Sequence, residues 1–194
     1  MTQSILVSFF RRKQILVVIS IITIIYFKTY IFNFFIEYKV YDISLPKYKV
    51  ENVEFEKVIN DYCDSKEILS IYDVVSTSLT ITSQVLTFSS STKSNNPNIL
   101  TESKNAHCVG YANYFSTVCN YLLSNYEINS DWVAIPKRGQ IYFCGFNIHN
   151  YLGSSTFVKD HDFVCIKNIS SNELCLWVDP SLYNFTYINY ISIK

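Results

Sequence analysis

The chain has 194 residues, of which 49% are hydrophobic, including 16 Tyr and 14 Phe, so it can bury a core and is not predicted to be disordered. Its formal net charge is zero, but residues 1–36 hold four basic residues and no acid, which leaves −4 on residues 37–194. A chain with an acidic C-terminal part lacks the basic patch that binds nucleic acid. Catalysis or contact with a protein is the better expectation.

The first long apolar segment predicts a membrane anchor. Thirteen uncharged residues run from Ile15 to Phe27, and the apolar character resumes after Lys28. A helix over residues 15–36 would rise roughly 30 Å, which is enough to cross a bilayer core, with Lys28 reaching toward the far interface. We therefore predict a single transmembrane anchor at residues 15–36.

The basic cluster at residues 11–13 precedes this segment. By the positive-inside rule it keeps residues 1–14 in the cytoplasm and sends the rest across the membrane, to the periplasm or the cell exterior. A cleaved signal peptide is an alternative, although no small-x-small cleavage pattern follows. A buried core helix is a second alternative, which the flanking charges and the lack of acids disfavour.

The remaining helices are expected before the strands. Residues 37–52 are a linker or lead-in strand, since Pro46 excludes a helix there. Apolar residues at helical spacing follow, and then a loop rich in Ser and Asn. These segments are Phe55–Tyr62 and Ile68–Leu86 for the helices, and Ser89–Asn98 for the loop.

The clearest helix is Cys108–Tyr126, where apolar residues recur every three or four positions. Asn105 is the expected N-cap, which places Cys108 in the first turn. Beyond it the pattern changes to strands at Trp132–Ile135, Gln140–Phe146, His161–Lys167 and Leu174–Asp179. Helices followed by strands predict an α+β domain at residues 53–194, with the Cys108 helix packed on an antiparallel sheet.

The last two strands are joined by a short polar loop, as in a hairpin. One register places His161 opposite Asp179. The same register opposes Phe163 and Trp177, Cys165 and Cys175, and Lys167 and Glu173. In that register Cys165 and Cys175 could form a disulfide, but packed thiols are the better expectation.

A thiol at a helix N-terminus, an imidazole and a carboxylate make up a nucleophilic triad. Cys108 would be the nucleophile, His161 the base and Asp179 the group that orients the imidazole. The backbone N–H of Cys108 is one oxyanion donor, and Asn105 is a guess for the second. Taken singly, a cysteine is more often a small buried hydrophobe and a histidine more often a core hydrogen-bonding residue.

No cofactor or metal is predicted. The chain has no acidic cluster suited to calcium, and His107 and His149 lack the spacing of zinc ligands.

Three motifs resemble the transglutaminase-like superfamily. Cys108–Ala112 resembles its C-x-G-Y-A nucleophile motif and Trp177–Ser181 its W-x-V-D-P-T/S motif, with His161 opening a strand between them. The resemblance covers roughly residues 65–185. It implies a papain-like core with a Cys108–His161–Asp179 triad. The chain departs from the family at Ala106-His107 before the cysteine and at Asp162 after the histidine.

This resemblance implies a membrane-anchored cysteine hydrolase or acyltransferase that acts on peptide or amide bonds through a thioester. Members of the superfamily include cross-linking acyltransferases, peptidases and amidases, and some domains that have lost activity. The expected partners are a protein or peptide substrate and, through the N-terminal helix, the membrane. The alternatives are a catalytically inactive binding or assembly domain, and a structural membrane protein in which the three residues are incidental.

Overall fold

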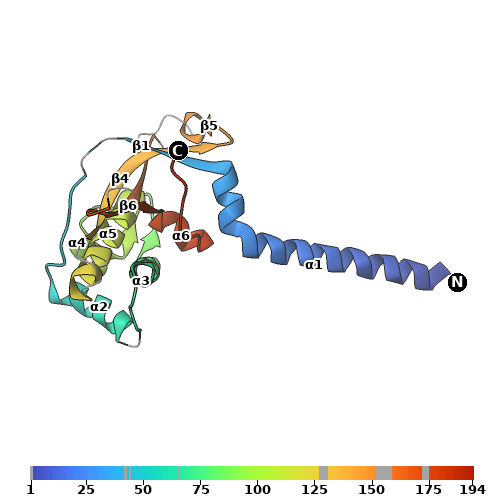
Figure 1. The fold of residues 1–194 in the computed structure, drawn as a ribbon, viewed down its shortest axis with the longest axis horizontal. Coiled ribbons are helices and arrows are strands. Elements are labelled where there is room, and N and C mark those ends of the chain that lie inside the picture. Colours follow the sequence, from blue (N-terminus) through green and yellow to red (C-terminus); the bar gives the residue numbers. More distant parts are fainter. Residues whose placement is uncertain are drawn as a thin grey trace.

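The computed structural model describes residues 2–41, 43, 45–64, 66–126, 131–151, 159–171 and 175–194, with side chains from Gln14 onward. These residues form a curled antiparallel sheet covered by helices, and one long N-terminal helix that projects away from the sheet (Figure 1).

Helix α1 spans Thr2–Phe35. Its segment Gln14–Phe35 has 22 residues and a mean hydropathy of 2.3, so it is long and apolar enough to cross a membrane. The apolar span is not buried, and Ile15, Leu16 and Ile25 are each about 60% exposed, with values of 58%, 63% and 62%. The segment is therefore not a core helix of the folded domain.

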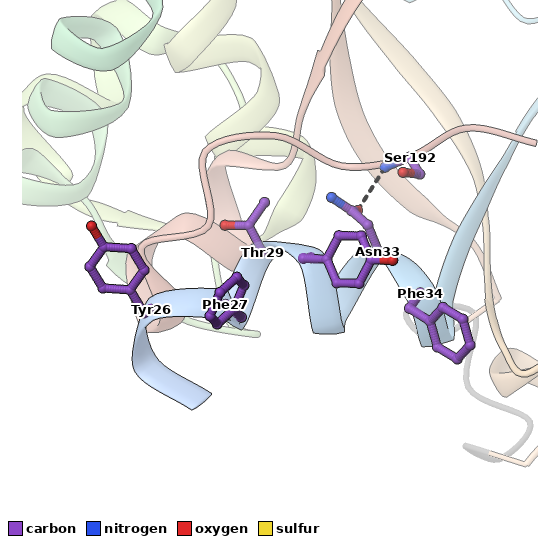
Figure 2. A pocket seen from close by; sticks show the side chains of 7 residues that line it. Tyr26, Phe27, Thr29, Asn33, Phe34 and Ser192 are labelled. Atoms are coloured by element: carbon purple, nitrogen blue, oxygen red, sulfur yellow. Dashed lines mark hydrogen bonds between the residues drawn. The ribbon is translucent and has the colours of Figure 1, made fainter. Parts of the chain in front are cut away.

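The last turns of α1 are attached to the C-terminal segment of the chain. Figure 1 shows α1 bending before it reaches the sheet. Lys28 Nζ donates to the carbonyl of Thr186 at 2.8 Å. Asn33 Nδ2 donates to the carbonyl of Tyr190 at 3.1 Å, and Asn33 Oδ1 accepts from the backbone N–H of Ser192 at 2.9 Å (Figure 2).

Lys28, which was expected to reach toward the far interface, contacts the end of α6 in the folded domain. Thr186 is the last residue of α6 (Pro180–Thr186), and the final carbonyls of a helix lack partners within the helix. A lysine amine is a suitable donor to such a carbonyl. The lysine therefore ties α1 to the folded domain.

Strand β4 (Trp132–Phe143) lies in the middle of the sheet. It pairs with β1 (Ile36–Tyr41) on one side and with β6 (His161–Asn168) on the other. The outer edge strand β7 (Cys175–Val178) pairs with β6, and the short β5 (Phe146–Asn147) pairs with the end of β4. The lead-in strand predicted within residues 37–52 is thus an integral part of the sheet.

The prediction of two separate strands at Trp132–Ile135 and Gln140–Phe146 was wrong, since β4 continues through Pro136. Proline cannot donate to a strand ladder and is tolerated where one side is unpaired. The pairing with β1 begins at Arg138, so β4 has only β6 as a neighbour at Pro136.

Helix α5 (Cys108–Asn125) packs on β4 and β6, and α3 and α6 pack against α5 (Figure 1). Its centre is buried, with Tyr111, Phe115 and Val118 each 0% exposed. The other elements are α2 (Val53–Cys63), α3 (Ile71–Val85), β2 (Thr87–Phe88), α4 (Pro97–Ser103), β3 (Asn105–Ala106) and the 3₁₀ helix η1 (Ile148–Asn150). The helices predicted at Phe55–Tyr62, Ile68–Leu86 and Cys108–Tyr126 are confirmed within a few residues.

The predicted register of the last hairpin was wrong by two residues. Cys165 faces Trp177, and Lys167 faces Cys175. Glu173, the predicted partner of Lys167, lies outside the described residues. A shift of two residues leaves every side chain on its original face, so the hydrophobic alternation cannot distinguish the two registers.

The observed register still pairs apolar residues on the face toward α5. Val164 lies opposite Val178, and Ile166 lies opposite Leu176. On the other face the rings of Phe163 and Trp177 remain in contact, with centroids 6.0 Å apart. The two registers are therefore of equal hydrophobic quality, and only the tertiary structure distinguishes them.

Gly139 provides a test of how closely β1 must approach β4. A Cβ at this position would lie 1.9 Å from the carbonyl oxygen of Lys39 in β1. We expect Gly139→Ala to lower the free energy of unfolding by about 1–3 kcal/mol, because two backbones would have to separate. Chemical denaturation followed by circular dichroism measures this change.

Gly145→Ala is the control, since a Cβ there meets nothing within 4 Å and the cost is limited to its positive φ of 82°. An equal loss of stability in both variants would contradict the close approach.

Candidate active site

Cys108 is the first residue of α5. The residue is 9% exposed, and its thiol lies where the unpaired N–H groups of the helix concentrate partial positive charge. The N-cap is His107, whose Nδ1 accepts a hydrogen bond from the N–H of Val109 at 3.2 Å. The prediction that Asn105 caps this helix was wrong, because Asn105 belongs to β3 and pairs with β2.

Asn105 also shows no sign of being an oxyanion donor. Its side chain is exposed, and its amide donates to the carbonyl of Ser103 at 2.9 Å.

His161 is the first residue of β6, and Asp179 follows the last residue of β7. His161 Nε2 lies 2.7 Å from Asp179 Oδ2, and their side chains are 18% and 2% exposed. In the observed register the two residues are diagonal neighbours rather than directly opposed, and long side chains bridge such diagonals. The pairing of this histidine with this aspartate therefore survives the two-residue shift of the hairpin.

Both carboxylate oxygens of Asp179 are engaged. Oδ1 caps helix α6, accepting from the N–H of Leu182 at 3.0 Å and from the hydroxyl of Ser181 at 2.8 Å. Oδ2 accepts from His161 and also from the phenol of Tyr38 at 2.8 Å. With Nε2 of His161 donating to a carboxylate, Nδ1 is left to exchange a proton with Cys108.

Electrostatics at the site favour a thiolate–imidazolium pair. Burial disfavours the thiolate of Cys108, but hydrogen bonds from His107 and His161 and the charge of His161 lower its pKa to about 6. Burial likewise opposes a charged His161, yet the carboxylate of Asp179 and the thiolate of Cys108 raise its pKa well above the ordinary value. Each group stabilises the charged form of its neighbour.

The same balance holds for the carboxylate. Burial of Asp179 works against ionisation, but the charge of His161 and the hydrogen bonds at both oxygens hold its pKa below the ordinary value. Asp179 is thus an anion and His161 a cation at every pH between the lowered pKa of the first and the raised pKa of the second.

Asp162, one of the departures from the family pattern, has a defined partner. Its side chain is 1% exposed and binds Arg138 through two contacts, at 2.6 Å to Nε and 3.0 Å to Nη2. The backbone N–H of Asp162 donates a hydrogen bond to the sulfur of Cys108, which also lowers the thiol's pKa. The ion pair fixes the start of β6, where this donor and His161 lie side by side.

An open apolar depression lies beside the His161–Asp179 pair, with a volume of about 350 Å³. Its walls come from the end of α1 and from strands β1, β2 and β4, helix α6 and η1, and include Phe32, Tyr38, Phe88, Leu182 and Phe185. A second pocket, of about 620 Å³, lies at the bend of α1 and contains no part of the Cys108–His161–Asp179 group (Figure 2).

The other cysteines differ from Cys108. All six are free thiols, Cys165 and Cys175 included. Burial raises the pKa of Cys119 to about 12, and burial together with neighbouring Cys175 does the same for Cys165. Within the described ranges, no group of three or more His, Cys, Asp or Glu could hold a metal ion.

Comparison with protein-family models, with curated proteins and with solved structures found no match. The functional argument therefore depends on the chemistry of the chain's own residues.

Sequence reasoning missed two residues that form hydrogen bonds within the candidate active site. Tyr38 lies 141 positions from Asp179 in a segment interpreted as a linker, and no local pattern connects the two. His107 was considered as a metal ligand and as a departure from the superfamily motif, but not as a partner of Cys108. Its position next to Cys108 at a helix start was the available signal, because the N-cap residue lies beside the first-turn side chains.

We expect Cys108 to react fastest of the six thiols at low pH. At pH 6 about half of it is thiolate, against less than ~1% of a thiol with the ordinary pKa of ~8.5. Iodoacetamide at pH 6, followed by mass spectrometry of the peptides, should label Cys108 at least about tenfold faster than exposed Cys144. Equal labelling of the two would show that the thiol is not activated.

Asp179→Asn tests the origin of this activation. Asparagine caps a helix as well as aspartate does, so α6 should be retained while the negative charge is lost. Without that charge His161 holds its proton less tightly and supports the thiolate less. The midpoint of the pH dependence of Cys108 alkylation should therefore rise from about 6 by at least about 1 pH unit.

The matched control is Asp73→Asn, which removes a carboxylate from the first turn of α3. It should leave the midpoint unchanged. If both variants shift the midpoint alike, a general change in charge and not the His161–Asp179 pair is responsible.

Proposed function

We propose that this chain is a membrane-anchored cysteine hydrolase or acyltransferase of the transglutaminase-like type, with a papain-like core. Cys108 is its nucleophile, His161 its acid–base group and Asp179 the group that orients the imidazole. The observation that carries the proposal is the chain of contacts from the thiol at a helix N-terminus to an imidazole whose other nitrogen binds a buried carboxylate.

In the proposed reaction the Cys108 thiolate attacks the carbonyl carbon of an amide and forms a C–S bond. The oxygen becomes an oxyanion, for which the N–H of Cys108 is a donor. The His161 imidazolium gives its Nδ1 proton to the leaving nitrogen, the C–N bond breaks, and an acyl thioester remains on Cys108. Water or an amine then gives a proton to His161 and attacks the thioester, which releases the thiolate.

The electrostatics suit both halves of this cycle. The nucleophile is ionised near neutral pH because its partner is protonated, so no separate deprotonation is needed before attack. Asp179 keeps Nε2 protonated throughout, so that Nδ1 alone exchanges protons with substrate.

The substrate we propose is a protein or peptide. The apolar depression beside His161 and Asp179 offers a place for apolar groups next to the reacting amide. Helix α1 would hold the enzyme in the membrane with the N-terminus in the cytoplasm and the folded domain on the opposite side, since basic residues precede the apolar span.

Cys108→Ala tests the reaction. We expect the full-length protein in detergent, incubated with tryptic peptides of casein, to accumulate an acyl adduct on Cys108 that hydroxylamine removes. The adduct should be absent from Cys108→Ala. With a fluorescent primary amine present, the wild type should transfer the acyl group to the amine if it is an acyltransferase and to water if it is a hydrolase.

Cys119→Ala is the control, because that thiol is fully buried in the core. Equal peptide turnover by the wild type and Cys108→Ala would contradict the proposal. An alkylation-competent Cys108 that never becomes acylated would favour an inactive binding domain.

A further inference from the structure

Tyr38 lies in β1, three residues beyond the end of the long apolar helix, and it touches the deepest group of the site. Its hydroxyl donates to Asp179 Oδ2 at 2.8 Å, and His161 Nε2 lies 2.7 Å from the same oxygen. The phenol and the imidazole therefore share one carboxylate oxygen. A stronger hydrogen bond from one of them weakens the hydrogen bond from the other.

The phenol is held rigidly in this position. Tyr38 is 1% exposed, and its ring meets the ring of Phe163 edge to face at a centroid distance of 5.2 Å. Its backbone is bound on the side away from β4, since its N–H donates to the carbonyl of Ser192 at 3.1 Å and its carbonyl accepts from the N–H of Lys194 at 3.2 Å. On the other side it pairs with Ile141 of β4.

The phenol also remains a donor at every pH at which the domain would work. Burial, and then the charge and hydrogen bond of Asp179, hold the pKa of Tyr38 well above its ordinary value. It cannot therefore act as a base, and its effect on the site passes through the carboxylate.

We propose that Tyr38 is a positioning residue of this site, which fixes the Asp179 carboxylate and limits how strongly that carboxylate holds the proton of His161. The inference rests on the proposed function, in which His161 must give up a proton to the leaving nitrogen. Without the hydrogen bond from the phenol, the carboxylate would stabilise the imidazolium more strongly, and His161 would release its proton too slowly.

A consequence concerns the segment next to the anchor. Residues 37–52 connect the apolar helix to the helical part of the chain. They also supply Tyr38, which acts through Asp179 on the pKa of His161. The segment that binds the backbone of Tyr38 also binds the end of α1, through Asn33 and Ser192. The end of α1 and the acid–base group are therefore held by one continuous set of contacts.

Tyr38→Phe is the test, because it keeps the ring and removes the hydroxyl. The charged and titratable groups near His161 are Asp179 on its Nε2 side and Cys108 on the other, with His107 and the Arg138–Asp162 pair beside Cys108. All of these remain in the variant. The chain has 3 His, so the ring nitrogens of His161 can be assigned and titrated by NMR in the full-length protein in detergent micelles.

We expect His161 to lose its proton at a pH at least about 0.5 units higher in Tyr38→Phe than in the wild type, since Asp179 then puts more charge on the imidazolium. Turnover of the casein peptides should fall about threefold in kcat, the most that a rise of about 0.5 in the pKa of the general acid can cause. KM should change little, because the variant keeps the aromatic ring that lines the depression.

Tyr111→Phe is the matched control. Tyr111 is 0% exposed, and its hydroxyl makes one buried hydrogen bond, to the carbonyl of Leu86 at 2.9 Å. Both variants should lose similar stability, but only Tyr38→Phe should move the His161 titration. A His161 titration that is unchanged or moves to lower pH in Tyr38→Phe would overturn the inference and leave Tyr38 a purely structural residue.

The two proposals fail separately. If Cys108 is alkylated rapidly at pH 6 but Tyr38→Phe does not change the His161 titration, the role of Tyr38 is wrong and the proposed function stands. If the titration moves as expected but Cys108 is neither activated nor acylated, Tyr38 still tunes His161 and the proposed enzymatic function is wrong.

Discussion

The carboxylate of Asp179 is the point on which the site depends. It is 2% exposed and receives hydrogen bonds from a helix N-terminus, a serine hydroxyl, a phenol and an imidazole. A buried anion without such partners would cost several kcal/mol. Because the donors come from β1, β6 and α6, these three elements must all be in place before the carboxylate can be buried.

From this carboxylate the charge pattern extends outward to Cys108. Asp179 stabilises a protonated His161, and His161 stabilises the thiolate at the start of α5. Arg138 and Asp162 form a separate pair beside it, which fixes the backbone donor to the sulfur. The site therefore keeps its charges in adjacent pairs, as a buried site of this kind must.

The long apolar helix is physically connected to this arrangement. Its last turns bind the C-terminal segment through Lys28 and Asn33, and the strand that follows it supplies Tyr38. An apolar helix that could span a membrane is thus continuous with an edge of the sheet. The folded domain would lie close to the bilayer surface if this helix crosses the membrane.

The sequence by itself determined the long apolar segment, the helices α2, α3 and α5, and the three residues that carry the proposed chemistry. Period, composition and local motifs are properties of neighbouring residues, and they placed Cys108 in the first turn of its helix and His161 at the start of its strand. The tertiary structure alone decided the hairpin register, since a shift of two residues keeps the same side chains on each face of the sheet. It alone brought Tyr38 to Asp179 and Arg138 to Asp162, because hydrogen bonds between distant segments leave no periodic trace in the sequence.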